Sequence, residues 1–199
     1  IPLWFSSPGI SVMASCNSTS NAFWVKADGG TSSKVDGSPV SSWTDESGNG
    51  NTVTAPSVNQ RPIYRDNFIN GFPALEFDNN NAANQNDYLT APDAPNLDNT
   101  NGFTLFSVAR TNNTNNNPRS IYSKRVNVGN NQAIMFFWYN NNRMTLDVVT
   151  ENNRFDSNPT VFAANTNYIA TATYDGTLTN NSNSKAKPIP IEANFAQRW

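Results

Sequence analysis

Residues 23–28 read FWVKAD and residues 41–51 read SSWTDESGNGN, and a Gly- and Ser-rich spacer separates them. The aromatic, apolar run from Phe23 to Ala27 predicts one short strand, and the alternation that begins at Val40 predicts a second, half-buried strand over residues 40–44. The second strand runs into a loop dense in side-chain oxygen atoms, because Ser-Gly-Asn-Gly-Asn is typical of a turn. Since this stretch holds no nucleophile beside a general base, it indicates a scaffold and a binding surface before it indicates catalysis.

Short strand patterns continue along the rest of the chain, with turn residues between them. The dipeptide Asn70-Gly71 is a strong turn signal, and strands are expected after it at residues 74–77 and 87–89. Further strands are expected at residues 102–110, 120–124, 133–139, 143–149 and 168–174. No stretch has helical periodicity for more than about two turns. The pattern predicts an all-β fold, an antiparallel β-sandwich of two sheets or a jelly roll.

The composition excludes several classes of protein. A chain of 199 residues with a formal net charge of -2 and 14% charged residues lacks the clustered Lys and Arg of a nucleic-acid-binding surface. The absence of histidine removes His-dependent catalytic triads and His-ligated zinc, and the single cysteine, Cys16, removes an internal disulfide. No run approaches the ~20 apolar residues of a membrane-spanning helix. The runs of asparagine are expected to be loops, because strand patterns bracket each of them.

Several motifs occur in one order along the chain: WVKAD at 24–28, VSSWTDESGNGN at 40–51, Arg61-Pro62, NGFPALEFD at 70–78, DYL at 87–89, GFTLFSV at 102–108 and YIATATYDG at 168–176. This series resembles the laminin-G-like, concanavalin A-like jelly-roll domains of large secreted bacterial surface proteins. The resemblance implies two facing antiparallel sheets over residues 23–178 and an extracellular location, secreted or at the cell surface. It also implies a role in glycan binding or adhesion, with calcium near the loops.

The two ends of the chain depart from that family pattern. Residues 1–22 are an N-terminal extension, and residues 179–199 are a C-terminal extension where the family has further strands. Ile189 and Ile191 alternate with Pro190 and Glu192, and residues 1–5 are apolar, so each extension is expected to form an edge strand. Two alternatives stay open: the extensions pack on their own domain, or they add to the sheet of a neighbouring copy of the chain.

Two groups of oxygen-bearing residues are candidate calcium ligands. Asp45, Ser47 and Asn49 alternate in the loop after the second strand, and calcium takes six to eight oxygen ligands of this kind. Asp78 closes one expected strand and Asp87 opens the next, so their carboxylates can join a site if the two loops meet. The alternative is a turn in which Asp and Asn side chains bond to their own backbone, with the other carboxylates capping strand ends.

Aromatic rings and loop asparagines are candidate sugar contacts, because a ring face offers an apolar platform to sugar C–H groups. The candidates are Trp138, Tyr139, Asn140 and Tyr88. Trp138 and Tyr139 end one expected strand just before an Asn-rich loop, although core packing of one of the two stays an open alternative. Trp24 and Trp43 lie within alternating strands and are expected in the core.

Three functions of different classes follow from these features. The first is a non-catalytic module that binds a polysaccharide or a cell-surface glycan, or mediates adhesion. The second is a structural subunit of an extracellular filament or surface assembly, in which terminal strands join further copies of the chain. The third, a glycoside hydrolase or lyase, is disfavoured because the glutamates are far apart in the sequence and histidine is absent.

Overall fold

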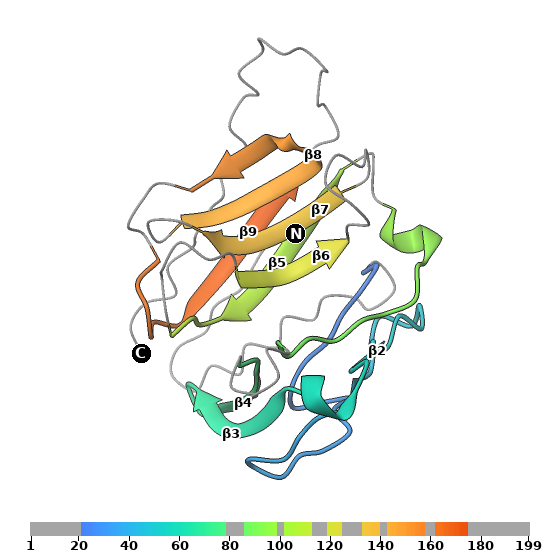
Figure 1. The fold of residues 1–199 in the computed structure, drawn as a ribbon, viewed down its shortest axis with the longest axis vertical. Helices are drawn as coiled ribbons and strands as arrows, with labels where there is room; N and C mark the ends of the chain where they lie inside the picture. Colours follow the sequence, from blue (N-terminus) through green and yellow to red (C-terminus); the bar gives the residue numbers. More distant parts are fainter. Residues whose placement is uncertain are drawn as a thin grey trace, which may run out of the picture. The chain divides into compact units, whose positions relative to one another are not determined.

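The computed structural model describes residues 21–78, 86–98, 102–112, 119–124, 133–139, 143–157 and 162–174. The chain divides into two compact units, unit 1 (Ile1–Leu97) and unit 2 (Asp98–Trp199), and this division falls inside the 23–178 range predicted as one sandwich. The strands are antiparallel, and the described residues contain no α-helix, only 3-10 turns at Val58–Gln60 and Pro95–Leu97 (Figure 1). The predicted all-β class is therefore confirmed.

The described part of unit 1 contains two short antiparallel pairs of strands. Its strands are β1 (Ser42–Trp43), β2 (Val53–Thr54), β3 (Ile63–Ile69) and β4 (Phe72–Glu76), with β1 paired to β2 and β3 paired to β4. Asn70 and Gly71 connect β3 to β4 with φ angles of 52° and 85°, so both lie in the left-handed region that a tight hairpin turn requires. The predicted turn at this dipeptide is confirmed.

Two strand predictions in unit 1 are wrong, and a third is confirmed only in part. Residues 23–27 form no strand, because Trp24 and Lys26 use backbone groups to bond with side chains of β1 and of the loop that follows it. The Trp24 amide donates to Asp45 Oδ1 at 3.0 Å, and the Lys26 carbonyl accepts from Trp43 Nε1 at 2.8 Å. Residues 87–89 are likewise not a strand, although Thr90 bridges to Thr54. The expected strand at 40–44 is reduced to β1.

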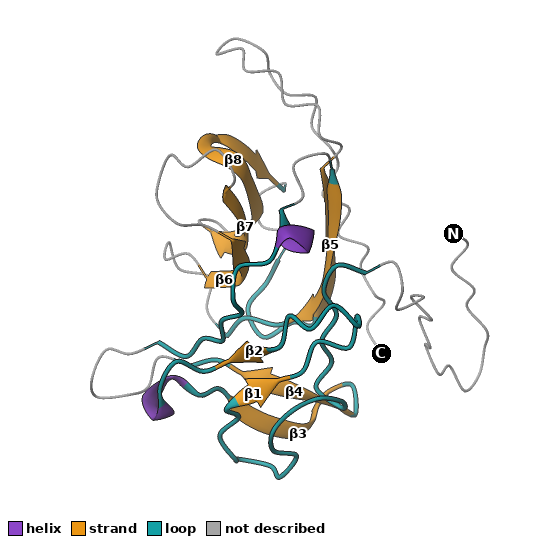
Figure 2. Cartoon of the chain, turned by 90° about the vertical axis from the view of Figure 1, so that its right-hand side faces the viewer, coloured by secondary structure: helices purple, strands orange, loops and turns teal. Residues whose placement is uncertain are grey.

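Unit 2 contains the longer strands. They are β5 (Phe103–Ala109), β6 (Arg119–Lys124), β7 (Ala133–Tyr139), β8 (Arg143–Asp156) and β9 (Tyr168–Tyr174), arranged as a β5–β9 pair and a β6–β7–β8 sheet. Figures 1 and 2 show these two sheets as separate layers. All five strands were predicted, and only β8 is clearly longer than expected.

The extra length of β8 folds back beside its own beginning. The Met144 amide donates to Ser157 Oγ at 3.0 Å, and the Ser157 amide donates to the Met144 carbonyl at 2.9 Å. Thr145 Oγ1 also donates to Asp156 Oδ1 at 2.7 Å. The end of β8 therefore returns along residues 144–145, as the bent ribbon labelled β8 in Figure 1 shows.

A hydrophobic core lies between the two sheets of unit 2. Its buried members are Ile134, Phe136, Trp138, Met144, Leu146, Val148, Phe162, Tyr168, Ala170, Ala172 and Tyr174. All of them except Phe162 come from alternate positions of β7, β8 and β9, as expected for strands with one inward face. The Phe162 ring meets the Tyr168 ring edge-on, with centroids 4.8 Å apart. Unit 2 is thus sandwich-like, with its core supplied by the alternation visible in the sequence.

Candidate functional site

The first group of predicted calcium ligands forms a closed hydrogen-bonded loop. Asp45 Oδ1 accepts from the amides of Trp24 at 3.0 Å and Ser47 at 2.9 Å. Asp45 Oδ2 accepts from Ser47 Oγ at 2.8 Å and the Asn51 amide at 2.9 Å. Each carboxylate oxygen thus has two donors, which matches the lone pairs that it offers.

The environment of Asp45 favours a structural role. Its side chain is only 6% exposed. Burial acts to raise its pKa, but the hydrogen bonds from Trp24, Ser47 and Asn51 outweigh burial and lower the pKa below its ordinary value. A metal ion here would have to displace those donors, so the loop does not fit calcium as it stands. The alternative reading, a turn held by its own Asp side chain, describes this loop better.

Asparagine side chains tie the same loop to both ends of the described part of unit 1. The Ala22 carbonyl accepts from the Nδ2 atoms of Asn51 and Asn96, both at 3.0 Å. Asn49 Nδ2 donates to the Asn21 carbonyl at 2.8 Å and to Ala22 at 3.3 Å. We call Ala22, Asn49, Asn51 and Asn96 the asparagine clamp.

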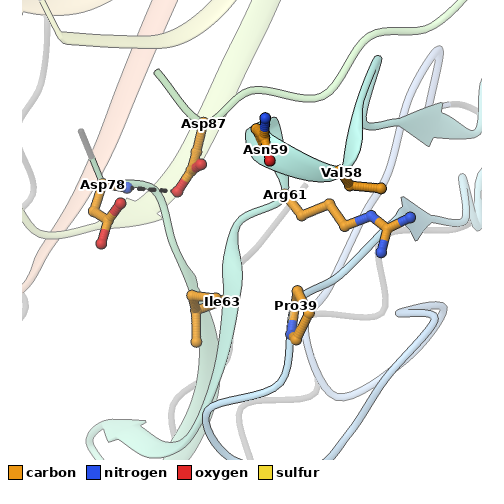
Figure 3. Close-up of a pocket in the computed structure, with 7 residues that line it drawn as sticks. All are labelled: Pro39, Val58, Asn59, Arg61, Ile63, Asp78 and Asp87. Carbon is orange, nitrogen blue, oxygen red and sulfur yellow. Dashed lines mark hydrogen bonds between the residues drawn. The ribbon is translucent and has the colours of Figure 1, made fainter. Parts of the chain in front are cut away.

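The second predicted pair of carboxylates is brought together by the fold. The Asp78 amide donates to Asp87 Oδ2 at 3.0 Å, and the Asp87 amide donates to the Asp78 carbonyl at 3.2 Å. Both residues line a shallow hollow of about 230 Å³ that is open to solvent (Figure 3). Its other lining residues are Pro39, Val58, Asn59, Arg61 and Ile63, so the hollow lies entirely in unit 1.

The hollow has an acidic end and a basic end. Figure 3 shows the Asp87 carboxylate directed toward Asp78, while the Arg61 side chain extends away from both. The Arg61 Nε atom is buried and has no hydrogen-bond partner within the part of the chain that the structure describes. Pro39 and Ile63 supply an apolar wall between the two ends.

Asp87 is the carboxyl group whose pKa is raised at this hollow. Burial is the main cause, and the negative charges of Asp78 and Glu76 add to it, while the hydrogen bond from the Asp78 amide acts in the opposite direction. The raised pKa means that this side chain gains from a ligand that donates hydrogen bonds or carries positive charge. Among the described residues, no group of three or more His, Cys, Asp or Glu is placed to hold a metal ion.

Two exposed aromatic residues are neighbours in the chain of the carboxylates that line the hollow. Tyr88 follows Asp87 directly and is 42% exposed, and Phe77 precedes Asp78 and is also exposed. The Tyr88 amide donates to the Gln60 carbonyl at 3.2 Å, which holds this segment beside the 3-10 turn that carries Asn59. Tyr88, proposed from the sequence as a sugar contact, thus follows Asp87 in the chain, but it is not among the residues that line the hollow.

The remaining predicted sugar contacts, Trp138, Tyr139 and Asn140, belong to unit 2. The two aromatic residues have different environments. Trp138 is 6% exposed and packs in the core cluster. Of the two residues Trp138 and Tyr139, it is therefore the one to which the alternative of core packing applies. Tyr139 is half-buried, and the Arg154 guanidinium carbon lies 5.1 Å from the centroid of its ring. Asn140 lies outside the described residues.

An ion pair between Asp147 and Arg154, both in β8, was not predicted from the sequence. Arg154 Nε and Nη2 donate to the two carboxylate oxygens of Asp147 at 2.8 Å and 3.0 Å. Asp147 is 2% exposed, and Arg154 also lies 5.6 Å from the ring centroid of Phe137. Since both charges are paired and the rings are covered, this cluster stabilises unit 2 and leaves Tyr139 without a free ring face on that side.

Two residues of the hollow were missed by sequence reasoning as site residues. Arg61 appeared only within a family motif, and Asn59 had no signal of its own. Both depend on the 3-10 turn at Val58–Gln60, which is started by Ser57 Oγ accepting from the Asn59 amide at 3.3 Å. A serine two residues before an asparagine is a weak turn signal, and it does not indicate which cavity the turn faces.

No family model, no curated protein and no solved structure matches this chain. The resemblance to laminin-G-like domains therefore stays a prediction. A search of the described residues finds no helix of the length and apolar character needed to cross a membrane.

Proposed function

We propose that the chain is a non-catalytic carbohydrate-binding or adhesion module of a secreted or cell-surface protein, and that it contacts a polysaccharide or cell-surface glycan at the hollow of unit 1. The observation that carries this proposal is the two-ended polarity of the hollow, with Asp78 and Asp87 at one end and Arg61 at the other. Tyr88, which follows Asp87 in the chain and is exposed, offers a ring to a glycan that extends beyond the hollow.

A sugar ring suits this arrangement because its hydroxyl groups both donate and accept hydrogen bonds. Carboxylate oxygens of Asp87 accept from hydroxyl groups, and the Arg61 guanidinium donates to them. The ring's C–H groups would contact Ile63 or Pro39 within the hollow, and Tyr88 would contact a further unit of the glycan. A volume of about 230 Å³ is below the ~300–1,000 Å³ of pockets that enclose drug-sized ligands, so the hollow suits about one sugar unit of a longer chain.

Calcium enters this proposal only at the Asp78–Asp87 end. Two carboxylates fall short of the six to eight oxygens that calcium takes, so the remaining ligands would be sugar hydroxyl groups and water. Such an ion would offset the repulsion between the two carboxylates. A chelator therefore distinguishes the two forms of binding: it should weaken calcium-dependent binding and leave calcium-independent binding unchanged.

The finer fold assignment is part of the same proposal. The facing sheets and shared core of unit 2, together with the ordered motifs of the sequence, support a relationship to concanavalin A-like jelly rolls. The fold does not determine a function on its own, so the glycan-binding proposal depends on the hollow.

Substitutions at the hollow should weaken binding without unfolding unit 1. Asp87→Asn and Tyr88→Ala are each expected to weaken binding to a responsive polysaccharide about tenfold, the loss of roughly 1.4 kcal/mol that one charge-assisted hydrogen bond or one stacking contact supplies. A glycan array identifies the polysaccharide, and a pull-down or calorimetric titration with and without chelator measures the affinity. Asp28→Asn and Phe72→Ala, an exposed carboxylate and an exposed ring away from the hollow lining, are the matched controls.

Equal binding by Asp87→Asn, Tyr88→Ala and the wild type would contradict the assignment of this hollow. Turnover of the polysaccharide that Asp87→Asn abolishes would replace the binding proposal with catalysis.

Binding should weaken on acidification because Asp87 must be ionised to accept hydrogen bonds from hydroxyl groups. Because the pKa of Asp87 is raised, affinity should be lost as the pH falls through this native pKa, which lies above the ordinary value of 3.8. The effect on stability has the opposite sign: the fold disfavours the ionised form, so the penalty from Asp87 disappears as the pH falls through that pKa. Affinity measured from about pH 7 down to about pH 4 should fall for the wild type and stay flat for Asp87→Asn. A decline of the same size in both proteins would show that another group is responsible.

A further inference from the structure

The outward face of the β5–β9 sheet is uncharged and partly apolar. Thr104, Phe106 and Val108 of β5 point away from the core, opposite Thr173, Thr171 and Ile169 of β9. Phe106 is 53% exposed and Val108 is 54% exposed. These two side chains form an apolar strip beside the edge of the sheet, which the side chains of a neighbouring strand would extend.

The backbone edge of β5 is open as well. Within the described residues β5 pairs with β9 alone, over all seven positions, so its other edge has no described strand beside it. An edge strand with apolar side chains is a template for the addition of another strand, and proteins usually block such edges. The open edge and the exposed side chains both belong to β5.

Residues 188–195 lie outside the described residues, and their sequence, Pro-Ile-Pro-Ile-Glu-Ala-Asn-Phe, has the properties of a strand that closes an edge. In an extended conformation the odd-numbered residues share one face, which carries Ile189, Ile191 and Phe195. The same residues direct their N–H and C=O groups to one edge, while the two prolines, which have no N–H, lie at even positions and face the other edge. One edge can therefore pair with a sheet, and the other cannot extend it further.

We propose that residues 188–195 add in cis to the open edge of β5, as a strand of the same chain, with Ile189 and Ile191 beside Phe106 and Val108. Pairs of β-branched and aromatic side chains on neighbouring strands stabilise a sheet. The prolines then face solvent and prevent the addition of a further strand, which is the usual way to protect an exposed edge.

The chain is long enough for this arrangement. Tyr174 pairs with Phe103, so the open edge of β5 is about two strand spacings, or ~10 Å, from the end of β9. The intervening residues 175–187 can span up to ~40 Å when extended. A tether of this length gives an effective concentration in the millimolar range, which favours the chain's own segment over one from a second copy.

Cysteine cross-linking tests the proposal directly. In a Cys16→Ser background, which removes the chain's one cysteine, Val108→Cys is combined in turn with Ile189→Cys, Ile191→Cys or Ala193→Cys, because the register along β5 is open. Val108→Cys with Glu192→Cys is the matched control, since residue 192 lies on the opposite face. We expect at least one odd-numbered pair to form an intramolecular disulfide under mild oxidation, seen as a monomer with altered mobility on a non-reducing gel, and the control pair to remain reduced.

A second measurement uses the chain without introduced cysteines. Ile189→Lys with Ile191→Lys is expected to increase hydrogen exchange of β5 amides at least about tenfold, and Glu192→Lys to leave it unchanged, with exchange in β7 as the control for folding. Covalent dimers in the cross-linking experiment would overturn the cis arrangement and favour strand donation between copies. No disulfide in any odd-numbered pair, or unchanged β5 exchange in the double variant, would overturn the proposal altogether. Glycan binding in unit 1 is assayed separately, so either proposal can fail alone.

Discussion

Arg154→Leu is expected to destabilise unit 2 by about 3 kcal/mol. Removing one partner of a buried ion pair usually costs ~3–5 kcal/mol, and the lower end applies because the Arg154 side chain is partly exposed. Leucine keeps the site covered but leaves the carboxylate of Asp147 buried without its two charge-assisted hydrogen bonds. The contacts of the guanidinium with Phe137 and Tyr139 are lost as well.

The double variant Arg154→Leu with Asp147→Leu separates the cost of an unpaired charge from the loss of packing. We expect it to recover most of the lost stability, because apolar replacements of a buried ion pair are often neutral. Urea denaturation gives the free energies of unfolding, and hydrogen exchange in β7 assigns the change to unit 2. If the single and double variants were equally unstable, the charge pairing of Asp147 would not be the reason.

Asp45→Ala is expected to lower the stability of unit 1 by about 3 kcal/mol. The substitution leaves the amides of Trp24, Ser47 and Asn51 without their acceptor in a buried loop, and each lost bond to a charged group is worth about 1.5–3 kcal/mol before the loop relaxes. Asp28→Asn, an exposed carboxylate of the same unit, should have little effect. Hydrogen exchange of the β3–β4 pair reports the stability of unit 1.

The same residue gives unit 1 a defined response to acid. Because the pKa of Asp45 is lowered by folding, its contribution is fully present above the ordinary value of 3.8 and is lost as the pH falls through the native value. The stability difference between wild type and Asp45→Ala should therefore shrink below about pH 4. A difference that stayed constant with pH would assign the effect to packing of the side chain.

The strands of unit 2 were predictable because their alternation survives in the fold. In β9, Tyr168, Ala170, Ala172 and Tyr174 all face the core, as a period of two requires. The choice between Trp138 and Tyr139 was not predictable, since β7 reads AIMFFWY and is apolar on both faces. That choice is made by the returning end of β8, which places Arg154 over the second face, and no local pattern indicates such a contact.

Unit 1 was harder to predict because its order depends on bonds between distant segments. The sequence at β3 is interrupted by Asn67, which adopts a φ of 52° and shifts the pairing register between Arg65 and Ile69, so the strand shows no clear alternation. From the sequence, Asp78 and Asp87 could be assigned to one site only on the condition that their two loops meet. Whether two loops meet, and whether Arg61 lines the same hollow, is decided by tertiary contacts that the sequence does not display.

The asparagine clamp has a mechanical consequence. Ala22 and Asn96 lie near the two ends of the described part of unit 1, and a side-chain bond joins them directly. Chains of compact units often enter and leave close together. Tension applied along the polypeptide would therefore load this junction first, while residues 59–87 sit inside the closed loop and carry no force until it ruptures. The hollow would therefore keep its shape under end-to-end tension until the Ala22–Asn96 bond breaks.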